Sequence, residues 1–264
     1  MKMDAQGLVV SEKSVGENDR LVTILTREKG ILRAFVRQSR RSGGGKVSAA
    51  RLFTYSRFTI FEGRDSYIID DAQPIEVFFD LRKDIGRLSL AQYFCELAAS
   101  LAPQDAEAGD FLRLLLNAMY FLCKGTRTNA SVKSIVEMRM MSLAGYMPDL
   151  IYCAECKCYE ADLMLFLPRS GKIFCSDCYH PQEHAEPAVS LSRGAMTALR
   201  HTIYADFDKL FSFRVSPAAE RELAEASERY VLETLQRRFN TLEFYHQMVD
   251  LPASPAEQSD VERQ

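Results

Sequence analysis

The first third of the chain consists of short apolar runs that are interrupted by turn residues. The runs are rich in β-branched and aromatic side chains, a composition typical of β-strands. Glycine, asparagine and aspartate occupy the breaks between them. Five strands in such a short segment match a small barrel, for which the OB-fold is the commonest design. The predicted strands lie at residues 7–15, 20–27, 31–38, 52–61 and 65–70.

After Pro74 the pattern changes, and apolar residues recur three and four positions apart, as they do on one face of a helix. One of these helical stretches runs into Gly145 and Pro148, and glycine can cap a helix that proline cannot continue. The sequence therefore predicts an α+β protein in which an all-α domain follows the barrel. The predicted helices lie at residues 89–102, 107–125, 131–146, 190–204 and 217–239.

Composition and length support this division into domains. The 264 residues are 47% hydrophobic and 26% charged, which provides enough apolar material for a sizeable core in each of two units. We predict a barrel domain at residues 1–80, a helical domain at 81–250 and a disordered tail at 251–264. No apolar run is long enough to span a membrane, and the polar start does not resemble a signal peptide. We therefore expect a cytoplasmic protein.

Four of the seven cysteines form two C-x2-C pairs that are separated by eighteen residues. This spacing is typical of a zinc ribbon, because each short loop directs two thiolates at one tetrahedral ion. The intervening segment contains Arg169, Ser170 and Gly171, which predict a hairpin turn that brings the pairs together. The sequence thus predicts one structural Zn²⁺ in a lobe at residues 150–186. The predicted ligands are Cys153, Cys156, Cys175 and Cys178.

Other residues compete for this site. Cys158, His180 or His184 could replace one thiolate, although the paired spacing favours the four cysteines named above. Four thiolates leave no open position for water, so a catalytic zinc is not expected. Cys95 and Cys123 lie on apolar helix faces and are expected in the core.

A basic segment follows the second predicted strand. Between Arg27 and Arg57 nine basic residues accompany a single acidic one, Glu28, although the whole chain carries a net charge of -3. Arg33 and Arg37 would project from the same face of one strand. Nearby aromatic residues suit a groove for single-stranded nucleic acid, although such a charge run can equally be a solvated face. The candidate stacking residues are Phe35, Phe53, Tyr55 and Phe58, and the candidate DNA-binding residues are Arg27, Lys29, Arg33, Arg37, Arg40, Arg41, Lys46 and Arg51.

The chain contains none of the catalytic motifs that we sought. The segment 41–46 resembles half of a phosphate-binding loop, but Val47 stands where serine or threonine is required. Zinc-protease, serine-hydrolase and Cys–His signatures are absent from the sequence. We therefore expect a protein that is not an enzyme.

Several segments of the chain, taken in order, carry the pattern of one known family. In residues 7–41 a strand is followed by a Gly-Glu-x-Asp turn and by Leu-Val-Thr-x-x-Thr-Arg-Glu-x-Gly. Residues 58–98, 198–213 and 232–245 are similar to the end of that family's barrel and to its helices. Together these segments resemble the RecO family of bacterial recombination and DNA-repair proteins. Residues 35–41 and 70–76 depart from the family pattern.

The resemblance implies an OB-fold, a helical domain and a four-cysteine zinc lobe. It also implies a protein of the cytoplasm and nucleoid that binds single- and double-stranded DNA and anneals complementary strands coated by single-stranded DNA-binding protein (SSB). With RecR it would help to load the RecA recombinase. The SSB tail is acidic with an apolar end, so a pocket ringed by basic residues is implied. The candidates for that pocket are Lys133, Arg139 and Arg200.

Two other classes of function remain open. A transcription or RNA-binding factor would use the zinc ribbon itself for contact, but residues 159–168 are apolar and acidic where a nucleic-acid reader is basic. A metal-dependent hydrolase would need an open coordination position, which four thiolates do not leave.

Overall fold

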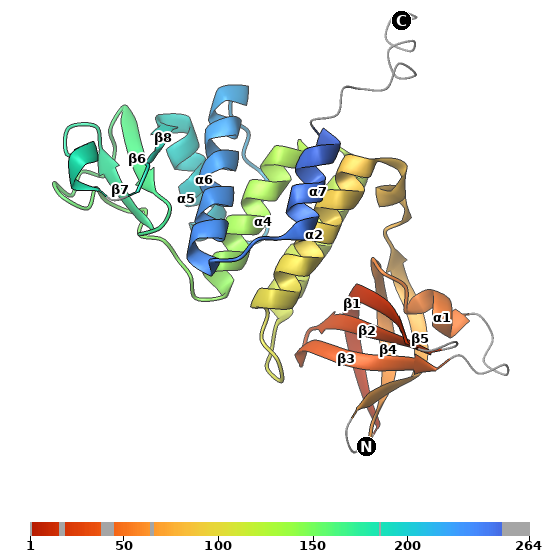
Figure 1. Ribbon diagram of the computed structural model, residues 1–264. Helices are drawn as coiled ribbons and strands as arrows, with labels where there is room; N and C mark the ends of the chain where they lie inside the picture. The colour runs from red at the N-terminus through yellow and green to blue at the C-terminus, as the bar shows by residue number, and fades with distance from the viewer. Residues whose placement is uncertain (1, 16–18, 38–44, 64–65, 185, 250–264) are drawn as a thin grey trace, which may run out of the picture.

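The structure is a computed structural model, and it describes residues 2–15, 19–37, 45–63, 66–184 and 186–249. Its N-terminal part is a closed five-stranded barrel with the strand order β1-β2-β3-β5-β4, in which only the β3–β5 pair is parallel (Figure 1). This confirms the predicted barrel. The strands are β1 (Lys2–Val15), β2 (Asp19–Thr26), β3 (Gly30–Arg37), β4 (Thr54–Glu62) and β5 (Tyr67–Val77).

The barrel has an interior core of its own. Side chains alternate along β3 and β4, so that one set fills the interior and the other faces outward. The short helix α1 (Gly45–Ala49) follows β3 and packs against β5 through Ala49. The largest interior residues are Phe58, Ile24, Ile60 and Ile69.

Two strands are longer than the apolar runs predict. β1 begins at Lys2 rather than at Gly7, and β5 continues past Asp70 to Val77. Proline usually ends a strand because it lacks a backbone N–H. Pro74 is tolerated in β5 because it lies beside a register shift opposite Tyr55 and Ser56.

Helices form the second part of the molecule, and α2 packs against α7 while α4 packs against α6 (Figure 1). Four of them begin at a residue whose side chain accepts a hydrogen bond from the first turn: Asp84, Thr128, Ser192 and Ser216. The elements are η1 (Phe79–Lys83), α2 (Ile85–Leu101), α3 (Gly109–Lys124), α4 (Asn129–Leu143), α5 (Arg193–Tyr204), α6 (Pro217–Leu235) and α7 (Asn240–Val249).

A three-stranded sheet with the order β7-β6-β8 packs beside α5 and α6. β6 and β7 form the predicted hairpin, and Gly171 adopts a positive φ of 66° in its turn. β8 occupies the start of a segment that the pattern assigned to a helix. The strands are β6 (Leu163–Leu167), β7 (Lys172–Cys175) and β8 (Val189–Ser192), and η2 (Pro181–Glu183) precedes β8.

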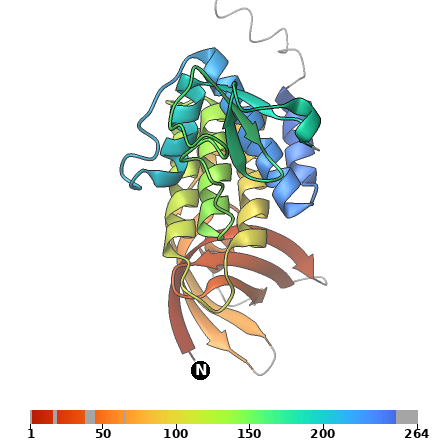
Figure 2. The same ribbon diagram turned by 90° about the vertical axis from the view of Figure 1, so that its left-hand side faces the viewer.

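The barrel is attached to the helices through backbone hydrogen bonds. The loop between α2 and α3 runs beside the β2–β3 turn, where the N–H of Ile31 donates to the carbonyl of Pro103 at 2.8 Å (Figure 2). The N–H of Ala108 donates to the carbonyl of Arg27 at the same distance. Gly30 has a φ of 61°, and a Cβ there would lie 1.9 Å from the oxygen of Pro103. Only glycine therefore fits this junction.

Outward-facing barrel residues belong to the helical core. Leu8, Val10, Leu25 and Ile31 are buried in the same cluster as residues of α2 and α3. In Figure 1 the barrel and the cysteine lobe (residues 150–186) lie at opposite ends of the helices. Within the described ranges, no helix is long and apolar enough to span a membrane.

Candidate metal centre and nucleic-acid interface

Four thiols converge in the cysteine lobe. The sulfur atoms of Cys153, Cys156, Cys175 and Cys178 all lie within 4.8 Å of one another. The Sγ atoms of Cys156 and Cys175 are 3.7 Å apart. Thiolates bound tetrahedrally to one zinc ion at about 2.3 Å would be separated by about 3.8 Å. The arrangement therefore fits a single tetrahedral metal ion, although other thiophilic ions share this preference.

Local backbone geometry places each pair of thiols. Lys157 adopts a φ of 62°, and its N–H donates to the carbonyl of Cys153 at 3.1 Å, which closes the first turn. In the second turn the N–H of Cys178 donates to the carbonyl of Cys175 at 3.1 Å. The β6–β7 hairpin then brings the two turns together, because Cys175 ends β7.

One thiol is already disposed to ionise. A hydrogen bond from the backbone of Cys158 is the main cause that lowers the pKa of Cys156 to about 6. Metal binding would displace the remaining thiol protons. Cys158 is not part of the group of mutually close sulfur atoms. His184 instead stacks on Tyr179, with ring centroids 5.1 Å apart.

Arg200 attaches the cysteine lobe to α5. Its side chain is buried, and its guanidinium donates to the carbonyls of Leu150, Ile151 and Tyr159 at 2.6 to 3.0 Å. The same guanidinium lies 4.0 Å from the ring centroid of Tyr159. Arg200 also contributes to a largely apolar cavity of about 490 Å³ that Ile151, Tyr159 and Tyr204 line.

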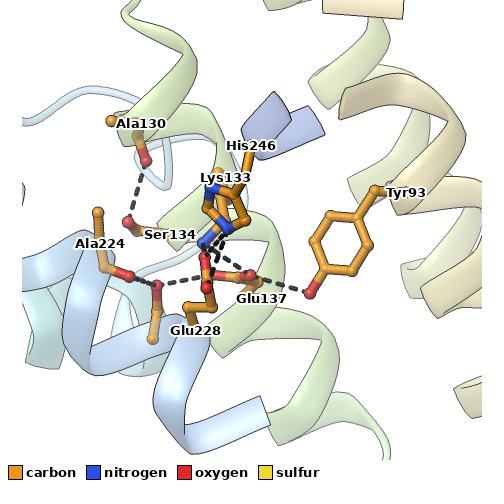
Figure 3. A network of polar contacts seen from close by, with 9 residues as sticks. Tyr93, Ala130, Lys133, Ser134, Glu137, Ala224, Glu228 and His246 are labelled. Atoms are coloured by element: carbon orange, nitrogen blue, oxygen red, sulfur yellow. Dashed lines mark hydrogen bonds and ion pairs between the residues drawn. The ribbon is translucent and has the colours of Figure 1, made fainter. Parts of the chain in front are cut away.

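Lys133 does not reach the surface, contrary to its proposed place at a partner pocket. Its Nζ atom lies 3.0 Å from a Glu137 oxygen and 2.8 Å from a Glu228 oxygen (Figure 3). Tyr93 and Ser227 donate to Glu137, and His246 contacts Glu228. The network joins α2, α4, α6 and α7, and it is structural because a buried cation needs these partners.

The side chain of Arg139 also contacts other residues of the helical domain. It donates to the carbonyl of Ile203, and its guanidinium lies 4.8 Å from the ring centroid of Phe207. Burial lowers its pKa. Among the three basic residues that were candidates for a partner site, only Arg200 borders a cavity among those described.

The basic residues of the barrel divide into separate groups. Arg33 and Arg37 are exposed on the outer face of β3, with the half-buried Phe35 between them. Arg27 and Lys29 lie in the β2–β3 turn beside the helices. Lys46 lies on α1 beside β5, and Arg51 precedes β4. Arg40 and Arg41 fall outside the described residues. Lys29 and Arg33 line the same hollow together with Tyr67, so the turn group and the β3 group adjoin there.

Two aromatic candidates for base stacking are unsuitable. Phe53 and Phe58 are fully buried, because Phe53, in the turn before β4, packs into the helical core and Phe58, on β4, faces the barrel interior. Tyr55 and Phe35 remain partly exposed. As expected, Cys95 is a core residue, and burial raises the pKa of its thiol.

A cavity between the barrel and α3 was missed by sequence reasoning. It has a volume of about 720 Å³ and contains Tyr55, Gln6 and Arg27 on its barrel side. No local motif marks it, because its two walls come from distant segments. Alternation along β4 does place Tyr55 on the outer face together with Arg57.

Comparison with known proteins covers almost the whole chain. Residues 1–78 match the family described as "Recombination protein O N terminal", and residues 82–243 match "Recombination protein O C terminal". A protein of Acetivibrio thermocellus named "DNA repair protein RecO" is 32% identical over 242 residues, which are 92% of this chain and 95% of that protein.

More distant relatives carry the same name. The protein of Alkaliphilus metalliredigens is 25% identical and covers 92% of this chain and 98% of its own length. The protein of Dehalococcoides mccartyi is 28% identical, with coverage of 86% and 90%. The similarity thus extends across both the barrel and the helices.

Proposed function

Because the chain belongs to the RecO family, whose members are named DNA repair proteins, we propose that it is a mediator of DNA repair and homologous recombination. It binds single- and double-stranded DNA and anneals complementary strands that SSB coats. Together with RecR it helps to load RecA. It acts by holding DNA strands and partners, without breaking or forming a covalent bond.

The main support for DNA binding is a row of outward-facing residues on β3, which we call the β3 stripe. Arg33, Phe35 and Arg37 share one outward face, so two guanidinium groups flank an aromatic ring. Guanidinium groups neutralise phosphates and release counterions, whereas the ring offers a surface on which any base can stack. Neutralised backbones repel each other less, so complementary strands can approach closely enough to pair.

Annealing of complementary strands, with and without SSB, tests the proposal. The variant Arg33→Ala/Arg37→Ala should anneal about tenfold more slowly, because it loses roughly two phosphate contacts. Arg193→Ala is a matched control, since this exposed arginine lies at the start of α5 and pairs with Glu160 and Asp162. Equal annealing by the double variant and the wild type would remove the β3 stripe from the mechanism.

The metal is proposed to be zinc with a structural role. Four cysteine thiolates are the ligand set of closed zinc sites, and no ligand position is left for water or substrate. Zinc supplies cross-linking here rather than Lewis acidity. Elemental analysis of the purified protein should give one zinc per chain, and Cys153→Ser/Cys175→Ser should lose it. One equivalent of another metal would contradict the assignment.

The SSB tail is proposed as a partner of the Arg200 cavity. Apolar walls from Ile151 and Tyr204 suit the apolar end of that tail, and the guanidinium of Arg200 supplies positive charge. Thr197 lines the same cavity, so Thr197→Trp should fill it and weaken binding of a labelled tail peptide about tenfold, whereas Thr197→Ala should not. Unchanged affinity in Thr197→Trp would place the tail elsewhere.

RecR is proposed as the second protein partner because the chain belongs to the RecO family. Co-sedimentation of the two purified proteins tests this directly. A stable complex whose formation stimulates RecA loading is expected, and separate sedimentation at micromolar concentrations would contradict it.

A further inference from the structure

A cavity that the functional proposals above do not use lies where the barrel meets the helices. Its volume of about 720 Å³ falls within the range of about 300–1,000 Å³ that is usual for ligand pockets. β1 contributes Gln6 and β4 contributes Tyr55, while the first turns of α3 form the opposite wall with Asn117 further along the helix. Neither the β3 stripe nor the Arg200 cavity shares a residue with it.

The wall residues offer the groups that recognise a nucleobase. Tyr55 provides an aromatic ring, and its hydroxyl donates to the Oε1 atom of Gln6 at 2.9 Å, which fixes both side chains. Asn117 adds an amide that can donate and accept. Glu107 and Asp110 add carboxylates, which accept hydrogen bonds from exocyclic amino groups of bases. Such a mixture of donors and acceptors suits a base better than a phosphate.

Two arginines stand beside the same residues. Gln6 pairs with Arg57 across β1 and β4, and the N–H of Arg27 donates to the carbonyl of Gln6 at 3.3 Å. Both arginine side chains are exposed. Arg27 and Arg57 also influence the Tyr55 hydroxyl: burial is the main cause of its raised pKa, and the two cations oppose that rise. Positive charge therefore lies next to the ring that would contact a base.

The junction is also rigid. The N–H of Ala108, the residue before α3, donates to the carbonyl of Arg27, so the two walls are joined by the backbone. A preformed site loses less conformational entropy on binding than a mobile one does.

We propose that this junction cavity receives an unstacked base of single-stranded DNA, while Arg27 and Arg57 bind the phosphates on either side of that base. The proposal rests on the proposed DNA-binding function and extends it. Bases in a duplex are stacked and paired, so they cannot enter. The cavity therefore distinguishes single strands from duplexes, a distinction that the exposed β3 stripe alone does not make.

Photo-crosslinking with DNA that contains 5-iodouracil tests the inference. Irradiation of the full-length protein with a substituted single strand should crosslink Tyr55, as identified by peptide mass spectrometry. The same sequence in a duplex should give little crosslinking at this residue. Asn117→Phe, which fills the cavity, should remove the crosslink and lower single-strand affinity about tenfold, the loss of one stacked base.

Tyr120→Phe is the matched control, because Tyr120 lies on α3 outside the cavity and its variant should behave like the wild type. If Asn117→Phe does not fold, Tyr55→Leu serves instead, with affinity as the readout. Crosslinking of Tyr55 that is equal in duplex and single strand would overturn the cavity proposal, as would full single-strand affinity in a folded cavity variant. In either case DNA binding through β3 would stand. A wild-type protein that binds no DNA at all would overturn both proposals.

Discussion

The barrel and the cysteine lobe are both small, and different interactions stabilise them. The barrel closes its hydrogen bonds around a ring of five strands and fills its interior with residues such as Phe58 and Ile60. The cysteine lobe has no separate core, since its buried residues Met164, Phe166 and Ile173 belong to the helical cluster. Its outer turns depend on four thiols and on Arg200. Regular strands therefore stabilise one end of the molecule, whereas the other end depends on the thiol cluster, which the proposed metal would cross-link, and on the hydrogen bonds of Arg200.

This difference in stabilisation suggests different roles for the barrel and the cysteine lobe. The barrel presents cations and aromatic rings on its surface without using them in its core, so it can contact DNA. In the lobe the thiols and the buried guanidinium are already engaged with the protein. We interpret the lobe as a fold element and the barrel as the surface that handles DNA.

Removal of the metal should produce the largest effect. Structural zinc sites in small peptides bind with about 10–16 kcal/mol, far more than a single packing contact contributes. A chelator, or Cys153→Ser/Cys175→Ser, should let the amides of the cysteine lobe exchange hydrogen at the rates of an unfolded chain. Barrel amides should keep their protection in hydrogen-exchange mass spectrometry.

Cys123→Ser is the control, because Cys123 lies on α3 away from the cluster. If the barrel amides lost their protection together with those of the lobe, the two ends would unfold as one unit. That result would contradict the separate stabilisation of barrel and lobe.

The next largest effect should follow from Lys133→Met. This change leaves the buried carboxylate of Glu137 beside Glu228 without its cation, which costs about 3–5 kcal/mol. Urea unfolding followed by helix circular dichroism measures the loss. Lys133→Met/Glu137→Gln should recover much of it, because the amide still accepts from Tyr93 and Ser227. No recovery in the double variant would mean that lost packing, rather than the uncompensated charge, dominates.

Gly30→Ala should weaken the junction between barrel and helices. The φ of 61° is unfavourable for alanine, and its methyl group would collide with the Pro103 carbonyl, so we expect a loss of about 2–4 kcal/mol. Gly45→Ala is the control, since nothing lies within 4 Å of a Cβ at that position. Wild-type stability of Gly30→Ala would show that the junction is loose.

Alkaline pH should destabilise the helical half by a smaller amount. Burial raises the pKa of Tyr93 and brings that of Tyr245 to about 12. Burial lowers the pKa of Lys133, but Glu137 and Glu228 raise it more, so the net shift is upward. These groups keep their protons in the folded state when the unfolded chain has lost them, so their contribution is complete below about pH 10 and declines above it.

The free energy of unfolding, obtained from urea unfolding between pH 9 and 10.5, should therefore fall as pH rises, with a limiting slope of about 1.4 kcal/mol per pH unit for each group. Tyr245→Phe should reduce this slope. A free energy of unfolding that is constant over this range would contradict the buried ionisation states.

Features with local causes were predictable from the sequence. Two C-x2-C turns and the hairpin between them set the thiol cluster, because neighbouring residues alone create each part. The barrel strands were predictable as well, because the apolar runs that indicate them involve only neighbouring residues. Gly145 acts at a helix end, and such an end signal involves only a few adjacent residues.

Features that depend on distant segments were not predictable. Lys133 and Glu137 are four residues apart on α4, which is the pattern of an exposed ion pair, yet Glu228 from α6 completes a buried network. Arg200 lies on a helix whose partner carbonyls belong to the cysteine lobe. The junction cavity likewise needs both the barrel and α3. Only the tertiary structure brings these groups together.

The central claim is that the barrel surface, and not the cysteine lobe, binds DNA. The most direct test is the affinity for a single strand across a salt series, measured for Arg33→Ala/Arg37→Ala and for the lobe variant Arg169→Ala/Lys172→Ala, which removes two exposed basic side chains. The account predicts that the barrel variant binds more weakly and that its slope of log affinity against log salt falls by roughly 1 per lost contact, with stability unchanged. The lobe variant should match the wild type. A reduced slope in the lobe variant and an unchanged slope in the barrel variant would contradict the account.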